Sequence, residues 1–283
     1  MKLSFEPLFP LFGVRVSGFD PTVPMDADTS EKLRNALRDH RLLLIRGYEL
    51  SEDDQVRLST VAGSLTYRNS GNYTDPDKRS SLVSNAHDDG MFGSGELSFH
   101  SDLSFTEHIL KARSLNALLL PPPTELGGET LYADVETAYD DLDEGIKRRV
   151  EGLRARFAAT YERADGTEVV EFVRPLIGTH PETGRRFIAA SRAVTKEVEG
   201  MERSEFRPLL KQLWEHMEQP KYIYRHRWEL NDCLFWDNIG LQHARTPFDP
   251  NLKRALRAVS IDESSVAASY AAAVNKVSAQ AGA

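Results

Sequence analysis

The sequence predicts a mostly β protein, folded as one β sandwich or barrel with flanking helices. Short apolar or alternating runs follow one another from residue 97 to residue 261, as expected of many short strands. Helical patterns lie at the margins of these runs and do not alternate with them, which argues against βαβ units. The composition, with 40% hydrophobic and 28% charged residues among 283, is that of a globular protein. We therefore expect a single domain over residues 1–262.

Charge and composition argue against several classes of function. The formal net charge of −8 provides no basic surplus to offset phosphates, so no nucleic-acid partner is expected. No apolar run approaches the ~18 residues of a membrane helix, so no membrane partner is expected either. Cys233 is the single cysteine, which excludes an internal disulfide framework and cysteine-rich zinc sites. The opening MKLSFEPLFPLFG is a poor signal peptide, so the sequence indicates a cytoplasmic enzyme.

Helix and strand signals begin near residue 28. Asp28 with Glu31 resembles a capping box and predicts a helix that runs to about His40. The apolar run 42–45 follows and predicts a buried strand. Ser51 then caps a second predicted helix.

Two polar segments interrupt the pattern of elements. Residues 66–96 are rich in Asn, Ser, Gly and Asp, with one short apolar stretch at Leu82-Val83. Long polar segments inside a compact domain are commonly functional, so this one is expected to form a lid over the active site. The Ala/Ser-rich tail, residues 263–283, is expected to fray or to form a loose helix.

The strand-rich region follows the predicted lid. Apolar residues at helical spacing predict helices over 142–153 and from Ser204 to Met217. A hairpin is expected between 168–177 and 186–190, around the turn PETG. Further strands are expected at 97–105, 114–120, 127–134, 222–228, 233–237 and 256–261.

Histidines spaced two residues before a carboxylate are the first candidates for chemistry. Such a pair can bind one metal from a strand or strand end, because side chains at i and i+2 share a face. Eight histidines and 43 acidic residues would produce about one such pair by chance. The sequence contains four pairs: His87/Asp89, His100/Asp102, His180/Glu182 and His216/Glu218.

Context separates these four pairs. The last pair falls on a predicted helix, where the two side chains point about 200° apart. The third lies in the predicted hairpin turn, where we expect polar side chains to face solvent. The first lies in the predicted lid. His100 and Asp102 lie where the lid meets the β region, and flanking apolar residues suit a site on a rigid scaffold.

A third ligand is expected from the C-terminal strands. His243 ends the run FWDNIGLQH, where a predicted strand enters a loop, and Arg254 follows before another strand. Two histidines, one aspartate and an arginine suggest the facial triad of non-haem Fe(II) oxygenases beside an anion site. A zinc-type metal hydrolase on the same triad is the alternative, with Asp89 or Glu96 as general base. A non-catalytic binding β sandwich is a third interpretation.

The sequence resembles the taurine dioxygenase and chlorophenoxyacetate dioxygenase (TauD/TfdA) family. The segments that carry this resemblance are HSDLSF, GGETLYADVETAYDDL, YRHRWELNDCLFWDN and QH…KRALRAVSI. The resemblance implies a double-stranded β-helix, or jelly roll, with flanking helices. It also implies an enzyme that uses Fe(II), 2-oxoglutarate and O₂ to hydroxylate a small organic substrate, or to cleave it through hydroxylation, releasing succinate and CO₂. Members of the family are often dimers or tetramers, so a homo-oligomer is expected.

The resemblance assigns roles to individual residues. It implies that Thr130 and Arg254 bind the distal carboxylate of 2-oxoglutarate, and that the backbone of Leu103 lies against this co-substrate. The run of Trp236, Asp237 and Asn238 is interpreted as structural support for the second histidine. The implied iron ligands are His100, Asp102 and His243.

Departures from the family pattern concern the substrate. Ala258 stands where relatives that take sulfonates or aryloxyacetates have a second arginine, and strand alternation sends the adjacent Arg257 to the opposite face unless a bulge intervenes. Glu96 stands where the taurine type has Asn. Losing a cation and gaining a carboxylate favours a neutral or amine-bearing substrate. The candidate substrate-binding residues are Glu96, His108, Tyr73, Asn69 and Arg257, with Tyr67 as a further pocket candidate.

Overall fold

The computed structural model describes residues 2–66, 79–163 and 166–267. The N-terminal elements are β1 (Ser4–Pro7), β2 (Val14–Ser17), α1 (Ala27–His40), β3 (Leu42–Ile45), α2 (Glu52–Ser59), the 3-10 helix η1 (Thr60–Ala62), β4 (Ser64–Leu65), β5 (Ser81–Ser84), β6 (Met91–Phe92) and β7 (Leu97–His100). The central elements are β8 (Ala112–Leu119), β9 (Thr130–Asp134), α3 (Val135–Asp140), α4 (Glu144–Val150), β10 (Arg154–Arg163), β11 (Gly166–Pro175), β12 (Ile177–Thr179), β13 (Arg186–Ile188), β14 (Thr195–Val198) and α5 (Arg203–Met217). The C-terminal elements are η2 (Pro220–Tyr222), β15 (Ile223–His226), β16 (Cys233–Asp237), β17 (Leu241–Arg245) and β18 (Ala255–Asp262).

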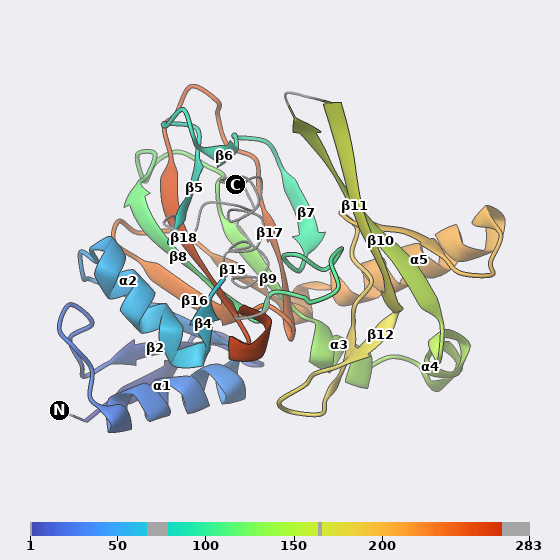
Figure 1. Cartoon of the computed structure of the whole chain (residues 1–283), viewed down its shortest axis with the longest axis horizontal. Helices are drawn as coiled ribbons and strands as arrows, with labels where there is room; N and C mark the ends of the chain where they lie inside the picture. The colour runs from blue at the N-terminus through green and yellow to red at the C-terminus, as the bar shows by residue number, and fades with distance from the viewer. Residues whose placement is uncertain (1, 67–78, 164–165, 268–283) are drawn as a thin grey trace, which may run out of the picture.

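Two β sheets face each other at the centre of the molecule (Figure 1). The larger sheet has the strand order β1-β2-β3-β16-β8-β18-β5-β6, and β4 pairs with β18 at its side. The smaller sheet has the order β15-β9-β17-β7. Apart from β1-β2-β3 and β5-β6, neighbouring strands in the two sheets come from distant parts of the chain, as expected of a jelly roll rather than a meander of hairpins.

Apolar side chains fill part of the space between the sheets. Tyr132 from β9 and Trp236 from β16 are fully buried, and their ring centroids lie 5.3 Å apart in an edge-to-face contact. Leu115, Leu234 and Leu256 join the same cluster from the larger sheet. The inner faces of the two sheets therefore form one core, and the polar residues that share this space need a separate explanation.

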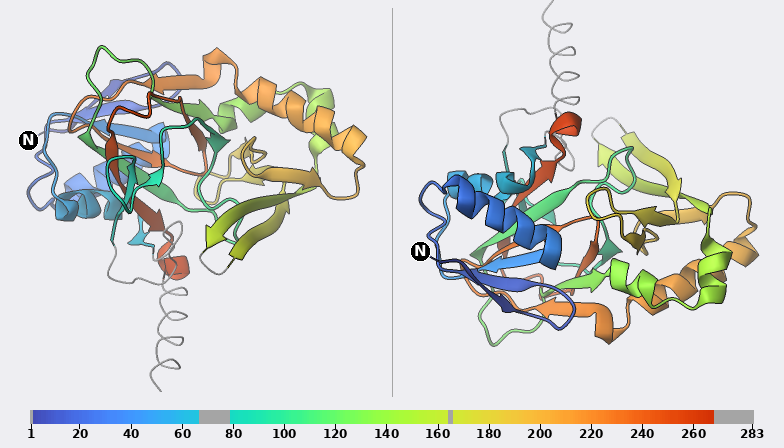
Figure 2. Two further views of the ribbon diagram at one scale, coloured as in Figure 1. Left: turned by 90° about the horizontal axis from the view of Figure 1, so that it is seen from above. Right: turned by 90° about the horizontal axis from the view of Figure 1, so that it is seen from below.

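The helices pack at two ends of this β core (Figure 2). Helix α1 buries Leu33 and Leu37 in a cluster with residues of β3 and β16, on the outer face of the larger sheet. Its N-cap is Asp26, whose carboxylate accepts a hydrogen bond from the backbone of Thr29, so the capping box predicted from Asp28 and Glu31 is wrong. The predicted cap Ser51 is confirmed, since it forms a capping box with Asp54 at the start of α2.

The segment between α3 and η2 forms a second layer beside the smaller sheet. Helix α5 lies there with all six predicted apolar positions buried: Phe206, Leu209, Leu210, Leu213, Trp214 and Met217. The hairpin predicted around PETG is confirmed only for β12 and β13, which pair through 177–179 and 186–188. Strand β11 pairs instead with β10, over all ten residues of each strand, so the predicted partner of 168–175 is wrong.

Two of the predicted strand boundaries are wrong around the candidate site. The strand expected at 97–105 ends at His100, because Leu103 has a φ of +56° that a strand cannot contain. His243, expected at the start of a loop, lies inside β17. Part of the predicted lid is also a sheet strand, since β5 pairs with β18. Tyr67, Asn69 and Tyr73, which belong to the predicted lid, lie outside the described residues.

Among the described helices, none has both the length and the apolar character needed to cross a membrane.

Candidate metal and co-substrate site

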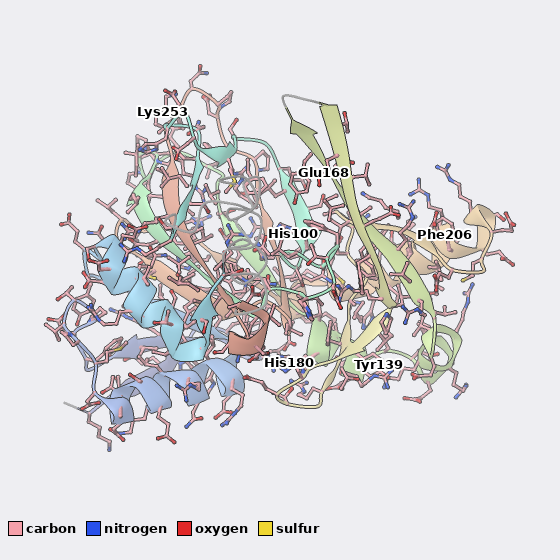
Figure 3. All side chains as sticks on the ribbon, in the orientation of Figure 1. His100, Tyr139, Glu168, His180, Phe206 and Lys253 are labelled. Atoms are coloured by element: carbon pink, nitrogen blue, oxygen red, sulfur yellow. The ribbon has the colours of Figure 1, made fainter. Side chains whose placement is uncertain are left out.

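His100, Asp102 and His243 converge between the two sheets. Strands β7 and β17 pair with His100 directly opposite His243, and the turn after β7 returns Asp102 to the same point. Each residue offers one ligand atom, and these atoms all lie within 4.8 Å of one another. The Nε2 atoms of His100 and His243 lie 3.8 and 3.6 Å from the carboxylate oxygens of Asp102. The sequence-predicted ligands therefore form one cluster, and Figure 3 labels His100 at this position beside β7.

The protonation states of the three residues suit a divalent metal. Nδ1 of His100 lies 2.8 Å from the carbonyl oxygen of Ser98 and can donate to it, which leaves Nε2 free as a ligand. Burial, together with the nearby His100, lowers the pKa of His243 to about 3 and keeps its ring neutral. Burial opposes ionisation of Asp102, but the charge of the Arg113 guanidinium outweighs this effect and lowers the pKa of Asp102 well below its usual range. Two imidazole nitrogens and one carboxylate are the donor set of a facial triad.

Asn238 holds the turn that carries Asp102. Its side-chain oxygen accepts a hydrogen bond from the backbone N–H of Asp102 at 2.9 Å, and its amide nitrogen donates to the carbonyls of Asp102 and Leu110. Trp236 packs on the ring of His243, with centroids 5.0 Å apart. Among residues 236–238, which were interpreted as support for His243, Trp236 contacts its ring directly, whereas Asn238 holds Asp102 instead.

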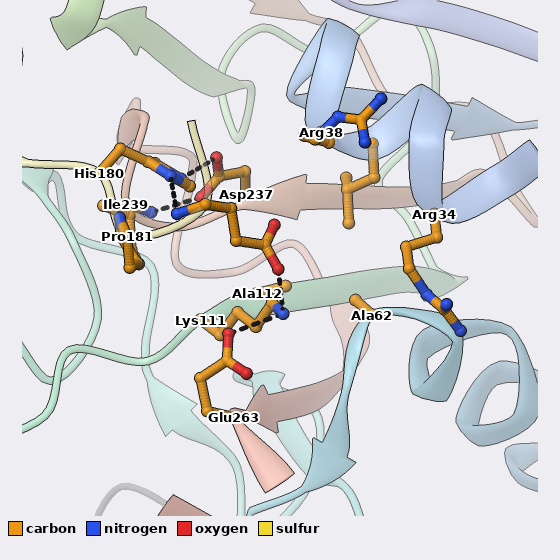
Figure 4. Close-up of a pocket in the computed structure, with 12 residues that line it drawn as sticks. Arg34, Arg38, Ala62, Lys111, Ala112, His180, Pro181, Asp237, Ile239 and Glu263 are labelled. Carbon is orange, nitrogen blue, oxygen red and sulfur yellow. Dashed lines mark hydrogen bonds and ion pairs between the residues drawn. The ribbon is translucent and has the colours of Figure 1, made fainter. Parts of the chain in front are cut away.

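Asp237 stabilises the turn between β16 and β17 through a buried contact with His180 (Figure 4). Nε2 of His180 lies 2.8 Å from Oδ2 of Asp237, and Oδ1 accepts hydrogen bonds from the backbone N–H groups of Ile239 and Gly240. Nδ1 of His180 accepts from the backbone N–H of Glu182, so Nε2 is the protonated nitrogen. His180 is only 3% exposed, so the expectation of a solvent-facing turn side chain is wrong.

We expect Asn238→Ala to weaken metal binding and stability together. The substitution leaves buried backbone groups of Asp102 and Leu110 without partners, which costs about 2 kcal/mol or more of unfolding free energy. Support of a metal ligand is commonly worth about 10- to 100-fold in affinity. Thermal unfolding and calorimetric titration with Mn(II) measure the two effects. Asn116→Ala is the matched control, because Asn116 is a buried asparagine that donates to Asp232 away from the triad; an equal loss of metal affinity in this control would contradict the assignment.

A cavity adjoins the triad between the sheets. Thirteen buried side-chain polar atoms in the described part of the chain have no hydrogen-bond partner. Buried polar groups are normally satisfied, so a concentration of such atoms indicates bound ligands. Five of them belong to residues that line this cavity: Asp102 Oδ2, Arg113 Nε, Trp236 Nε1, His243 Nδ1 and Arg245 Nη1. The residues present therefore fit a metal with a polar co-ligand.

Arg254 and Thr130 also line this cavity. Arg254 is 2% exposed, and in the described residues its guanidinium meets only the Gly128 carbonyl, at 3.1 Å, and the rings of Trp228 and Phe248. Burial lowers the pKa of Arg254 to about 9. Oγ1 of Thr130 accepts a hydrogen bond from Trp228 Nε1 at 3.0 Å, which leaves its own O–H free to donate. A buried cation without a carboxylate partner, beside a free hydroxyl, is a site for an anion.

The other candidate substrate residues are not brought into this cavity. Glu96 is exposed on the segment before β7 and does not line it. His108 is exposed and lines a separate cavity with Arg174. Arg257 turns to the outer face of β18, where its Nε donates to Gln55 at 2.7 Å. This agrees with strand alternation, because the register irregularity between β18 and β8 lies at Ala255 and Leu256 and not between Arg257 and Ala258. Leu103 is buried in the turn after β7 and does not line the cavity.

Arg113 and Arg245 line the cavity although the sequence analysis did not select them. Arg113 comes from β8, where it shares the inner face with Leu115. The available signal was strand alternation in the run ARSLNALL, which puts one arginine on an otherwise apolar face. Arg245 lies two residues after His243 on β17, so the same alternation could have found it.

A β fold with two histidines, one aspartate and a buried arginine in its inner cavity defines a class of proteins, the mononuclear non-haem metal oxygenases. Comparison with known protein families supports this class. Residues 4–260 match the model described as "Taurine catabolism dioxygenase TauD, TfdA family". The chain belongs to this family.

Individual relatives are similar over nearly their whole length. The alpha-ketoglutarate-dependent 2,4-dichlorophenoxyacetate dioxygenase of Burkholderia sp. (strain RASC) is 31% identical, over 91% of this chain and 93% of the relative. A taurine dioxygenase structure from Burkholderia xenovorans superposes with a TM-score of 0.79 at 27% identity, covering 92% of this chain and 89% of that one. The structure of AAD-2 in complex with Mn(II) and N-oxalylglycine gives 0.78 at 26% identity, covering 92% and 97%. These matches confirm the predicted jelly-roll fold and dioxygenase class, and do not support the zinc hydrolase alternative.

Proposed function

We propose that this chain is an Fe(II)- and 2-oxoglutarate-dependent dioxygenase that hydroxylates a small organic substrate, or cleaves it through hydroxylation. The observation that carries the proposal is the position of Arg254, a buried cation without a carboxylate partner in the described residues, in the same cavity as the triad. When bound, Fe(II) and 2-oxoglutarate supply O₂ activation coupled to oxidative decarboxylation, with succinate and CO₂ as products.

The residues of the chain bind and orient these groups. His100, Asp102 and His243 would hold Fe(II) and leave three coordination positions open. Thr130 and Arg254 would hold the distal carboxylate of 2-oxoglutarate, through a hydroxyl donor and a guanidinium fork. AAD-2, which is similar to this chain, was crystallised with Mn(II) and N-oxalylglycine, a metal and an oxalyl compound of the kind this arrangement would accept.

The partners and the cellular location of the chain are part of the same proposal. The family acts on small molecules, and we propose that this chain does so as a homo-oligomer in the cytoplasm, without a nucleic-acid or membrane partner. The net charge of −8 supports the absence of nucleic-acid binding.

An anaerobic titration tests the proposed function. Adding 2-oxoglutarate to the Fe(II)-loaded protein is expected to produce the weak visible charge-transfer band of the chelate near about 500 nm. His243→Ala is expected to abolish the band, whereas His216→Ala, on α5 and outside the cavity, is the matched control and should retain it. Admission of O₂ should then yield succinate. Absence of the band in the parent protein, with tight binding of zinc instead, would refute the proposal and revive the metal hydrolase.

A further inference from the structure

Arg113 is a buried arginine beside the triad whose donors are not fully used. Its Nη1 lies 2.7 Å from Oδ2 of Asp102, and its side chain is 7% exposed. This ion pair is not a well-aligned hydrogen bond, since Oδ2 of Asp102 accepts none. Nε of Arg113 is also buried without a partner in the described part of the chain. The guanidinium therefore pairs with the carboxylate through Nη1, while its Nε–H has no partner among the described residues and can donate to another acceptor.

The charges around the cavity are unbalanced. Among the described lining residues, Asp102 is the one carboxylate, against the guanidiniums of Arg113, Arg245 and Arg254. Arg245 donates to the carbonyls of Phe92 and Gly95, and Arg254 to that of Gly128. A metal ion bound to the triad would share the negative charge of Asp102. That carboxylate would then neutralise less of the positive charge of Arg113. A second anion next to the metal would restore the balance.

The register of the larger sheet places Arg113 and Arg254 at opposite ends of the cavity. Arg113 lies directly opposite Ser260 in the pairing of β8 with β18, whereas Arg254 immediately precedes β18. Six residues of strand correspond to about 20 Å of backbone, and both side chains turn inward to the same cavity. Arg113 therefore lies at the triad, and Arg254 lies at the far end of the cavity, beside Thr130. An anionic group bound at the metal would therefore meet Arg113, whereas Arg254 meets a group at the far end of the cavity.

We propose that Arg113 binds an oxyanion at the metal end of the cavity. Resting on the proposed function, this oxyanion is either the 1-carboxylate of 2-oxoglutarate or the anionic group of the substrate, since both present the same chemistry to a guanidinium. The earlier preference for a neutral or amine-bearing substrate depended on a carboxylate from Glu96 and on a cation missing at Ala258. Glu96 is exposed outside the cavity, and Arg113, on the strand next to β18, supplies a cation.

Calorimetric titration of the full chain tests this role in two stages. Mn(II) is titrated first, and 2-oxoglutarate is then titrated into the Mn(II)-loaded protein, for the parent, Arg113→Met, Arg113→Lys and Arg257→Met. Arg113→Met is expected to bind Mn(II) as tightly as the parent or more tightly, because a cation beside the metal has been removed. It is expected to bind 2-oxoglutarate about 10- to 100-fold more weakly. Arg113→Lys should recover part of this loss, and the control Arg257→Met, on the outer face, should match the parent.

The possible results distinguish 2-oxoglutarate from the substrate as the source of the oxyanion, and failure of this inference from failure of the proposed function. If Arg113→Met binds 2-oxoglutarate normally, but 2,4-dichlorophenoxyacetate or sulfate binds to the loaded parent protein and not to the variant, the oxyanion belongs to the substrate. If neither ligand distinguishes the variant, the inference is overturned. It is also overturned if Mn(II) affinity falls as far as 2-oxoglutarate affinity, because Arg113 then acts only by positioning Asp102. Failure of the parent itself to bind 2-oxoglutarate refutes the proposed function instead.

Discussion

Asp102→Ala is expected to abolish metal binding. Asp102 is the one carboxylate of the triad, and the other ionised groups on the described cavity wall are guanidiniums. Loss of a residue that only supports a ligand commonly lowers metal affinity about 10- to 100-fold, so loss of the charged ligand itself should exceed about 100-fold. Calorimetric titration with Mn(II) measures the change.

The same substitution leaves Arg113 buried without its carboxylate, which is commonly worth about 3–5 kcal/mol of unfolding free energy. The double variant Asp102→Ala/Arg113→Met removes both charges and is the control for folding. It should unfold near the temperature of the parent and still fail to bind Mn(II), whereas Arg113→Met alone should bind it. Mn(II) affinity within tenfold of the parent in the double variant would show that Asp102 is not a metal ligand.

The parts of the site that the sequence could predict depend on short-range patterns. His100 and Asp102 are two residues apart, and the apolar residues around them indicate a strand end, so their common direction follows from local geometry. The apolar stripe of α5 is equally local, and all six of its predicted positions are buried. His243 and Arg254 were selected from their strand contexts and from the family resemblance. Their meeting with His100 depends on the pairing of β17 with β7, which no local pattern specifies.

The parts that could not be predicted depend on contacts between distant segments. His180 is polar and lies in a turn, so its burial follows only from Asp237, 57 residues further along the chain. Strand β11 has the composition to pair with either neighbour, and the observed partner β10 precedes it. Nothing in the local sequence distinguishes Arg113 from another arginine on a strand. Its contact with Asp102 depends on the register of β8 and on the turn after β7. Charged residues in a buried cavity oppose the usual hydrophobic pattern, and they mark the functional site for that reason.

Arg254→Met is expected to weaken 2-oxoglutarate binding strongly while leaving the unliganded protein at least as stable as the parent. Truncating one partner of a buried charge pair costs about 2–5 kcal/mol of binding, so the affinity should fall about 30-fold or more. Without ligand, however, Arg254 is a buried cation with no carboxylate partner in the described residues, and methionine fills a similar volume without that desolvation cost. The two effects therefore have opposite signs.

Thermal unfolding of the Mn(II)-loaded protein, with and without 2-oxoglutarate, measures both effects. At a ligand concentration 100 times the parent Kd, binding stabilises the parent by about 2.7 kcal/mol, and a 30-fold or larger loss of affinity should reduce this increment to about 0.9 kcal/mol or less in Arg254→Met. Arg257→Met is the matched control, three residues further along and on the opposite face of β18. It loses hydrogen bonds to Gln55 and to the carbonyl of Leu50, so it should be less stable than the parent yet retain the full increment. If Arg254→Met keeps the increment, the co-substrate is not held by Arg254. If it instead loses stability without ligand, Arg254 supports the fold through the Gly128 carbonyl and the rings of Trp228 and Phe248.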